Sequence, residues 1–375
     1  LDITESGHQP MTYGDGRYCI SFNGEVYNFL ELREELRRLG HRFKSETDTE
    51  VILAAYAEWG EDCQYRFNGM WAFAIWDAHQ RLLFLSRDRF GVKPLYYLRI
   101  SDHLLFASEL KAFMALPKEL KPEFDYGMVA RVKNEESLEQ TLLQGVNNLQ
   151  AGCCLSCRPD GVPKIRKWWR TSEHLEKLPT EYGQQVEQFK ELFYDSCKIR
   201  MRSDVAIGTA LSGGLDSSSI LCALSDSRLN TSTNERLAPD WQKAFVLSYA
   251  HTSNDERKFA EQVIHHTGVS PVIVEIDPHN ISSDDLEAAI FSFEAIQNVE
   301  PSLGPWLIYQ EMRKEHVSVS IDGIGGDETL GGYREYLPIA LKDSILPFPS
   351  PRRWNDLMDI AAGLNEDTTE NARGE

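Results

Sequence analysis

A run of small residues with the sequence SGGLDSS, at positions 212–218, is the feature that most constrains what this chain can fold into. It stands between an apolar stretch that predicts a strand, residues 205–211, and a stretch that predicts a helix from Ser217 onward. Small residues let the backbone approach a ligand closely, and N–H groups at the start of a helix favour an anion. The run therefore predicts a loop that holds phosphate oxygens. A Ser/Gly turn that only caps a helix is the less specific alternative.

This phosphate-binding loop is not a Walker loop, because no lysine precedes its final serines. Asp216 stands in the loop instead. A carboxylate beside phosphates is tolerable only with a bridging cation, which most simply predicts Mg²⁺ together with a nucleotide.

Composition limits the class of protein. The chain has 375 residues, 42% of them hydrophobic, which suffices for about two domains of ~150 residues each. A net charge of −19 argues against a nucleic-acid partner, and no apolar stretch approaches the ~18 residues that span a membrane. The seven cysteines are scattered, which favours a reducing cytoplasm over a disulfide framework. Cys154 and Cys157 form a lone C-x-x-C, for which a half-buried strand is a simpler interpretation than zinc.

The first half of the chain has the pattern of a mixed domain. Aromatic and β-branched runs within 17–29 and 68–110 predict strands. Helices are expected at 29–39 and 49–59, each followed by a glycine. Residues 1–169 are therefore expected to form an α+β domain with layered antiparallel sheets.

After a polar linker expected at 170–184, strands alternate with helices, which predicts an α/β domain with a parallel sheet over residues 185–375. Ligands of such sheets bind at the carboxyl ends of the strands. The phosphate-binding loop lies at such an end, and so does the Gly-rich turn 322–328. The expected strands are 205–211, 245–249, 272–276 and 317–321, and the expected helices begin near Ser217, Asp255, Ser283 and Pro305.

Several motifs, taken in this order, resemble those of the glutamine-hydrolysing asparagine synthetase family over almost the whole chain. They are GHQPM at 7–11, NGEVYN at 23–28, DTE at 48–50, RDRFGVKPLYY at 87–97, the phosphate-binding loop, and the turn that ends in Asp327 and Glu328. The resemblance implies an N-terminal-nucleophile glutaminase-like domain, followed by an α/β pyrophosphate-loop ATP-binding domain.

In the first domain the resemblance implies a glutamine site. Asn23 would donate its side-chain N–H, and Gly24 its backbone N–H, to the oxyanion that forms when the family's N-terminal cysteine attacks the glutamine amide. Glu25 and Asp48 would pair with the α-ammonium group of glutamine. From the residues alone, Asn23-Gly24 also fits a hairpin turn between two strands.

In the second domain the resemblance implies cleavage of ATP between its α- and β-phosphates, which gives an acyl-adenylate and pyrophosphate. Asp216 and Asp327 would bind Mg²⁺, and Glu294 would lie near the adenylate and handle protons as ammonia attacks. From the residues alone, Glu294 also fits a surface position on an amphipathic helix, and Asp327 a tight turn. The implied ATP and pyrophosphate ligands are Leu211, Ser212, Gly213, Gly214, Leu215, Asp216, Ser217, Ser218, Leu247, Asp322 and Gly323.

The chain departs from the family pattern in three ways. No cysteine stands at its N-terminus and no counterpart of the family's catalytic lysine precedes residue 375, so we expect a fragment, truncated at both ends, that does not hydrolyse glutamine by itself. Asp322 stands where the asparagine-making members more often have serine. The leading prediction is synthesis of asparagine from aspartate with glutamine-derived ammonia, which releases AMP and pyrophosphate. The alternatives are a different carboxylate acceptor or a degenerate nucleotide-binding relative, and the oligomeric state stays open, with a homodimer as one option.

Overall fold

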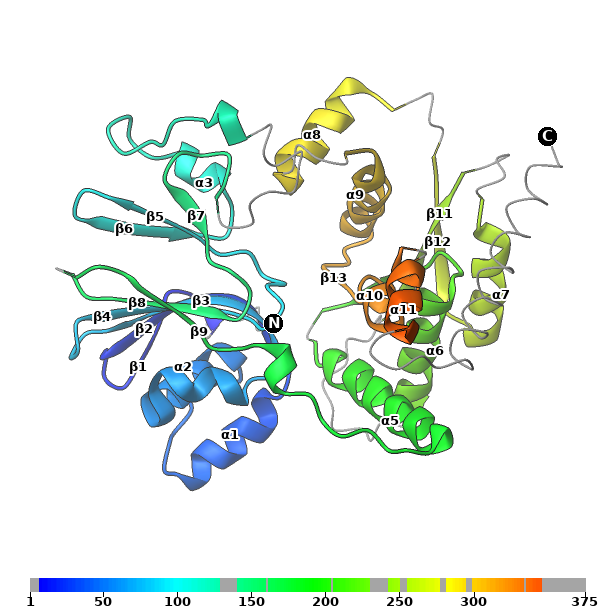
Figure 1. Ribbon diagram of the computed structural model, residues 1–375, viewed down its shortest axis with the longest axis horizontal. Helices are drawn as coiled ribbons and strands as arrows, with labels where there is room; N and C mark the ends of the chain where they lie inside the picture. The colour runs from blue at the N-terminus through cyan, green and yellow to red at the C-terminus, as the bar shows by residue number, and fades with distance from the viewer. Residues whose placement is uncertain are drawn as a thin grey trace.

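The computed structural model describes residues 7–128, 140–159, 161–203, 205–229, 242–249, 255–276, 281–294, 299–333 and 335–345. The first part of the chain forms a layered α+β domain and the second part an α/β domain with a parallel sheet (Figure 1). Both fold classes agree with the prediction from the sequence.

The first domain contains two antiparallel sheets. The strand order is β1-β2-β3-β4-β8-β9 in the larger sheet and β6-β5-β7 in the smaller one. Each of the pairs is antiparallel. The strands are β1 (Met11–Tyr13), β2 (Tyr18–Val26), β3 (Gly69–Asp77), β4 (Leu82–Arg87), β5 (Tyr96–Ile100), β6 (His103–Ala107), β7 (Val146–Asn148), β8 (Cys153–Cys157) and β9 (Lys164–Lys167).

Two helices cover one face of the larger sheet. Helix α1 (Phe29–Arg38) ends just before Gly40, whose φ of 99° suits a glycine, and α2 (Asp48–Trp59) begins after Thr47, whose hydroxyl accepts the Thr49 N–H. Their apolar residues pack against β2, β3 and β4, while the opposite face of that sheet packs against the smaller sheet. The result is three layers, visible in Figure 1. Shorter segments are η2 (Gly60–Arg66), α3 (Lys111–Met114) and η3 (Thr171–Glu173).

The second domain is built on a parallel sheet with the order β12-β11-β10-β13. Helices α6 and α7 pack on one face, and α9 packs on the other. The chain runs outward from β10 to β12 and then returns to the other side of β10, so the order reverses between β10 and β13. The elements are α5 (Tyr182–Arg200), β10 (Ile207–Ala210), α6 (Leu215–Leu229), β11 (Gln242–Ser248), α7 (Arg257–Thr267), β12 (Ser270–Glu275), α8 (Ser283–Phe293), α9 (Val299–Lys314), β13 (Val319–Ser320), α10 (Gly326–Leu330) and α11 (Tyr336–Ile345).

Several predicted boundaries differ from the structure by a few residues, and the start of α9 differs most. Helix α9 begins at Val299, so Pro305 lies inside the helix and does not mark its start. A proline is favoured at the first helical position, which is why the sequence suggested a start there. Helix α5 begins at Tyr182, inside the stretch expected to be a linker. Among the described residues, no helix combines the length and apolar character that a membrane crossing needs.

Candidate functional site

A candidate site is a pocket of about 990 Å³ at the carboxyl ends of β10 and β13. The strand order reverses between these two strands, and open parallel sheets bind ligands at such a point. One wall is the phosphate-binding loop after β10, and another is the Gly-rich turn after β13. The structure therefore brings together two segments that lie more than a hundred residues apart in the sequence, as the parallel-sheet prediction required.

The phosphate-binding loop is closed by its own serines. The Ser212 N–H donates to the Ser217 hydroxyl at 3.3 Å, the two hydroxyls lie 3.1 Å apart, and the Gly214 N–H donates to the Ser212 hydroxyl at 3.2 Å. Helix α6 starts at Leu215, and the first N–H groups of a helix have no partner within it. Leu215, Asp216 and Ser217 all line the pocket, so this end of α6 can receive phosphate oxygens.

Two residues of the loop do not belong to the pocket wall. Gly213 has a φ of 88°, and a Cβ added there would lie 2.5 Å from the backbone nitrogen of Ala260 in α7. The glycine therefore allows the loop to lie against α7. The Ser218 hydroxyl is buried in the helix and has no hydrogen-bond partner.

Asp216 and Asp327 face the same pocket. A Cβ added at Gly326 would lie 2.1 Å from Asp216 Oδ2, and one added at Gly332 would lie 1.8 Å from Asp327 Oδ1, so each carboxylate lies tightly against a glycine. Among the described side chains, no group of three or more His, Cys, Asp or Glu residues forms a complete metal site. Two carboxylates fit Mg²⁺, because this ion is usually held by one or two carboxylates together with substrate phosphates and water.

Asp322 lines the pocket, and its carboxylate accepts three hydrogen bonds. Its Oδ1 accepts the Ala210 N–H at 2.8 Å and the Ser320 hydroxyl at 2.5 Å, and its Oδ2 accepts the Tyr309 hydroxyl at 3.4 Å. These bonds fix the end of β10, from which the phosphate-binding loop starts. Sequence analysis missed Tyr309 and Ser320, since neither belongs to a recognisable motif.

An apolar part of the same pocket suits the base and sugar of a nucleotide. Leu211, which is 1% exposed, and Leu247 both line it, and their contact with adenosine stays a prediction. They are joined by Gly304 and Ile308 from α9. A Cβ added at Gly304 would lie 3.0 Å from Leu247 Cδ2, so the glycine keeps this part of the pocket open.

The predicted glutamine site lies on β2 in the first domain. Asn23 and Gly24 pair with Ala72 and Trp71 in the middle of the β2–β3 ladder, so the hairpin-turn interpretation is wrong. A Cβ added at Gly24 would lie 2.1 Å from the Met70 carbonyl oxygen. This position accepts only glycine because the two strands approach so closely.

Two acids come together beside this strand. Asp48 begins α2, and its Oδ2 accepts the Val26 N–H at 2.9 Å, which ties the helix to β2 next to Glu25. Burial, and then the negative charge of Asp48, raise the pKa of Glu25 to about 7, and burial also raises the pKa of Asp48. A nearby cation lowers the pKa of acids such as these, and the α-ammonium group of an amino acid is one such cation.

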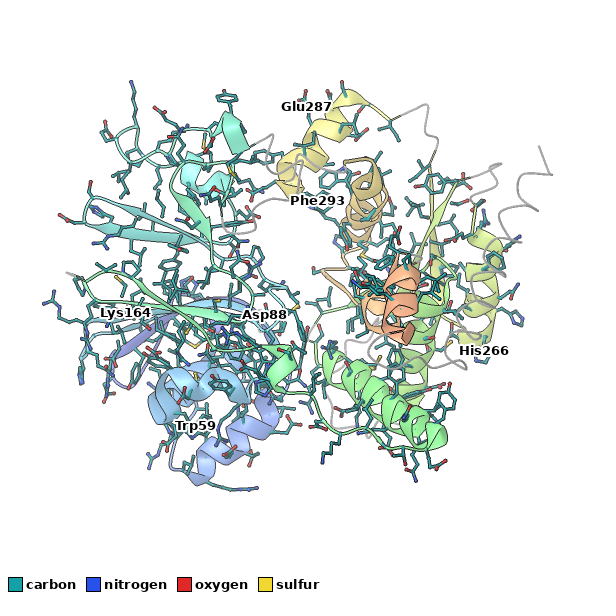
Figure 2. The ribbon with its side chains drawn as sticks, in the orientation of Figure 1. Trp59, Asp88, Lys164, His266, Glu287 and Phe293 are labelled. Atoms are coloured by element: carbon teal, nitrogen blue, oxygen red, sulfur yellow. The ribbon has the colours of Figure 1, made fainter. Side chains whose placement is uncertain are left out.

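The motif at 87–97 supports this site through Asp88, which is 1% exposed and labelled in Figure 2. Its two carboxylate oxygens accept backbone N–H groups from Trp71, Phe90, Val92 and Lys93. One buried side chain therefore shapes the loop and attaches it to β3, which explains the motif structurally.

Glu294 lies away from the nucleotide pocket. It ends α8 in the left-handed conformation, with φ 54°, and its carboxylate accepts the N–H groups of Leu110 and Lys111 at 2.6 and 2.7 Å. Both donors belong to the first domain. The structure therefore places Glu294 at the boundary between the domains. It does not line the pocket, and it does not lie on a freely exposed helix surface. A role at the adenylate stays a prediction.

A second contact joins the domains near the glutamine site. The Arg202 guanidinium donates to both carboxylate oxygens of Glu31, at 2.8 and 2.6 Å, and to the Tyr27 carbonyl at 2.6 Å. The Arg200 guanidinium lies 4.8 Å from the centre of the Tyr27 ring. Tyr27 follows Glu25 by two residues, so the second domain contacts the chain immediately after the predicted glutamine-binding strand.

Comparisons with known proteins agree with this two-domain arrangement. A family model described as a glutamine amidotransferase domain matches residues 1–169, and one described as asparagine synthase matches residues 188–372. The chain is 33% identical over 345 residues to asparagine synthetase (glutamine-hydrolyzing) 1 of Bacillus subtilis, covering 91% of this chain and 52% of that protein. It is 32% identical to a Methanocaldococcus jannaschii protein provisionally named asparagine synthetase (glutamine-hydrolyzing) 2, covering 93% of this chain and 68% of that protein. It is also 28% identical to amidase chyE of Penicillium rubens, covering 89% and 50% of the two chains.

Fold, site and family models together define a class of protein in which a glutamine amidotransferase domain precedes an α/β domain of the asparagine synthase type. Within that class, the chain belongs to the glutamine-hydrolysing asparagine synthetase family. It spans about half the length of the Bacillus subtilis relatives that it matches.

Proposed function

We propose that the full-length protein is an ATP-dependent amidotransferase that makes asparagine from aspartate with glutamine-derived ammonia, and releases AMP and pyrophosphate. One observation carries the proposal: the chain combines the half-buried Glu25 and the buried Asp48 beside the Asn23-Gly24 strand with a pocket, lined by a Ser/Gly-rich loop, at the switch point of a parallel sheet. Membership of the asparagine synthetase family supports the same assignment.

In the first domain, Glu25 and Asp48 hold the α-ammonium group of glutamine. The pKa of Glu25, raised to about 7, falls when this cation binds. The Glu25 carboxyl group therefore loses its proton and becomes negatively charged as the substrate binds. The side-chain amide of Asn23 and the Gly24 N–H donate to the oxyanion that forms at the glutamine amide carbon. The glycine has a second effect, because it lets β3 support this strand from behind.

In the second domain, the loop from Ser212 to Ser218 holds the pyrophosphate portion of ATP, and the apolar part of the pocket holds adenosine against Leu211 and Leu247. Asp216 and Asp327 hold Mg²⁺, which neutralises negative charge on the leaving pyrophosphate. Asp322 and Gly323 keep the second loop against the first, since a Cβ at Gly323 would lie 2.8 Å from the Ser217 nitrogen. Glu294 handles protons only in a conformation in which its carboxylate leaves Leu110 and Lys111.

We assign residues 1–169 to the glutaminase domain and the chain from α5 onward to the ATP-binding domain, so that the linker expected at 170–184 ends before Tyr182. Ammonia has to pass between the two sites, because free ammonia is mostly protonated at neutral pH and the ammonium ion is not a nucleophile. None of the seven cysteines forms a disulfide, which fits a reducing compartment, and we propose the cytoplasm.

A second candidate keeps the adenylation but changes the carboxylate that accepts the ammonia. The similarity to a protein named amidase chyE, over 89% of this chain, favours keeping this candidate beside the first. A panel of carboxylic acids separates the two, since each true acceptor should release AMP.

The test uses the full-length protein with ATP, Mg²⁺, aspartate and glutamine carrying ¹⁵N in its side-chain amide. We expect AMP, pyrophosphate and ¹⁵N-asparagine in equal amounts. ADP in place of AMP would exclude the adenylation chemistry. AMP formed with another carboxylate but not with aspartate would select the second candidate.

A further inference from the structure

The predicted oxyanion donor Asn23 has a partner that the proposed glutaminase reaction does not explain. Its side-chain Nδ2 donates to the Ser108 hydroxyl at 3.1 Å. Ser108 follows β6 of the smaller sheet, whereas Asn23 lies on β2 of the larger one. A side-chain amide has two N–H donors. With one of them held by Ser108, the amide has a fixed orientation and keeps its second N–H for a substrate.

The residues directly after Ser108 are held from the other domain. The N–H groups of Leu110 and Lys111 donate to the two carboxylate oxygens of Glu294, at 2.6 and 2.7 Å. The Lys111 ammonium lies 3.2 Å from the Phe291 carbonyl oxygen and 4.9 Å from the centre of its ring. Hydrogen bonds to a charged acceptor are the stronger kind, so this is a firm point of attachment between the domains.

Glu294 keeps this position against its local backbone preference. It ends α8 in the left-handed region, with φ 54° and ψ 24°, where glycine or asparagine is favoured. Only 14% of its side chain is exposed. A glutamate at a position where glycine would fit better points to a function of its side chain.

Helix α8 also connects to the nucleotide pocket. The ring of Phe293, labelled in Figure 2, meets the ring of Trp306 in α9 edge to face, with 6.3 Å between their centres. Three residues of α9 near Trp306, namely Gly304, Pro305 and Ile308, line the pocket. Figure 1 shows α8 lying between α9 and the part of the first domain that contains α3. These contacts, together with the turn from Ser108 to Lys111, connect the pocket wall on α9 to Asn23.

We propose that Ser108 is a positioning residue for the glutaminase, and that Glu294 couples it to the synthetase domain by holding the Ser108–Lys111 turn. A shift of α9 upon nucleotide binding moves Glu294, and Glu294 moves the turn. The Ser108 hydroxyl then sets the orientation of the Asn23 amide, so glutamine hydrolysis proceeds when the adenylate is ready to receive ammonia. This coupling rests on the proposed function of the two sites.

The Ser108 part is tested in the full-length enzyme with Ser108→Ala and its conservative counterpart Ser108→Thr. Removing an oxyanion-hole donor costs about 100-fold or more in kcat, and losing only its orientation should cost about ten-fold. We expect Ser108→Ala to lower the glutaminase kcat by about ten-fold with little change in KM, because the oxyanion exists only in the transition state. Ser108→Thr should restore kcat, and synthesis from ammonium salts should be unaffected. A glutaminase kcat that is unchanged in Ser108→Ala would overturn this part.

The Glu294 part is tested from the opposite side of the contact. Leu110→Pro removes one N–H donor, and the backbone of Leu110, with φ −64°, already suits proline. Leu110→Ala is the matched control, since it also loses the leucine side chain but keeps the N–H. Glu287→Gln, on the exposed part of α8 in Figure 2, controls for charge. We expect ATP and acceptor to stimulate the glutaminase in the unmodified enzyme and in both controls, but not in Leu110→Pro.

Hydrogen exchange provides a readout that does not depend on turnover. A non-hydrolysable ATP analogue should change the exchange of residues 108–113 in the unmodified enzyme and in Leu110→Ala, and not in Leu110→Pro. A glutaminase that responds neither to ATP nor to acceptor, in an enzyme that still forms AMP, would overturn the coupling and leave the proposed function intact. An unmodified enzyme that forms neither glutamate nor AMP would overturn the proposed function, and the coupling with it.

Discussion

The two acids of the glutamine site should make the binding of an α-amino acid depend on pH near neutrality. Burial, and then the charge of Asp48, raise the pKa of Glu25 to about 7. An acid with this pKa is about 10% ionised at pH 6 and about 90% ionised at pH 8. Because the α-ammonium group pairs with the ionised form, affinity should rise about ten-fold over this interval. Binding near pH 7, where Glu25 is about half protonated, should release about half a proton per ligand.

The same pKa determines the sign of the effect on stability. The pKa of Glu25 is 4.5 in its ordinary state and about 7 in the folded protein. Between these values the folded chain binds more protons than the unfolded chain, so the free energy of unfolding falls as the pH rises from 4.5 to about 7. The full difference corresponds to about 3 kcal/mol, and the actual value is smaller because Asp48 shares the proton. Above this range Glu25 is ionised in both the folded and the unfolded chain, so it contributes no further change to the free energy of unfolding.

Titration calorimetry with L-glutamate measures the binding directly, since this product keeps the α-ammonium group and is not turned over. Measurements at pH 6, 7 and 8, in buffers of different ionisation enthalpy, give the affinity and the number of protons released. In Glu25→Gln the affinity should be weak and equal at pH 6 and 8, whereas Glu287→Gln should behave like the unmodified protein. An affinity that stays constant from pH 6 to 8 in the unmodified protein, without proton release, would refute the reasoning.

Three further substitutions follow from single contacts. Gly24→Ala places a Cβ 2.1 Å from a backbone oxygen of β3, so the free energy of unfolding should fall by about 2 kcal/mol or more in chemical denaturation. An unchanged denaturation midpoint would contradict the close approach of the strands. Asp322→Ala leaves three donors without their acceptor, which should cost about 2–4 kcal/mol of stability and weaken ATP binding measured by fluorescence titration; unaltered ATP affinity would mean that the end of β10 needs no such support. Arg202→Lys loses the two-point contact with Glu31. Because the Glu31 side chain is 58% exposed, the free energy of unfolding should change by less than about 1 kcal/mol. Hydrogen exchange in the first turn of α1, which contains Glu31, should become faster. Because Arg202 lowers the pKa of Glu31, this difference should disappear as acid protonates Glu31, and a difference that persists in acid would exclude the ion pair as its cause.

Local sequence signals predicted most of the fold. The first two helices were predicted within a residue or two, because a glycine, Gly40 or Gly60, follows each of them. The phosphate-binding loop was predicted because its residue types, between a strand and a helix, leave few other structures. These signals act over a few residues, and neighbouring residues suffice to determine them.

The contacts that join the two sites could not be predicted in this way. Ser108 lies 85 residues from Asn23, and Glu294 lies 184 residues from Leu110, so only the packing of whole elements brings them together. Glu294 occupies a left-handed position that its residue type does not suggest. Pro305 misled the prediction of α9 for a related reason, because a local preference for helix starts was overridden by the packing of a longer helix.

Asp322, in the Gly-rich turn after β13, has a structural role in the fold of this domain. Its carboxylate accepts hydrogen bonds from Ala210, Ser320 and Tyr309, so its charge is used to hold the end of β10. A serine at this position would have a shorter side chain and could not accept from the same three donors. Asp322 therefore has a structural role in supporting the phosphate-binding loop, while it also lines the pocket, and its use as a pointer to another acceptor stays a prediction. The choice between aspartate and a different carboxylate must come from side chains that contact the acceptor, which is why the carboxylate panel, rather than a substitution of Asp322, decides it.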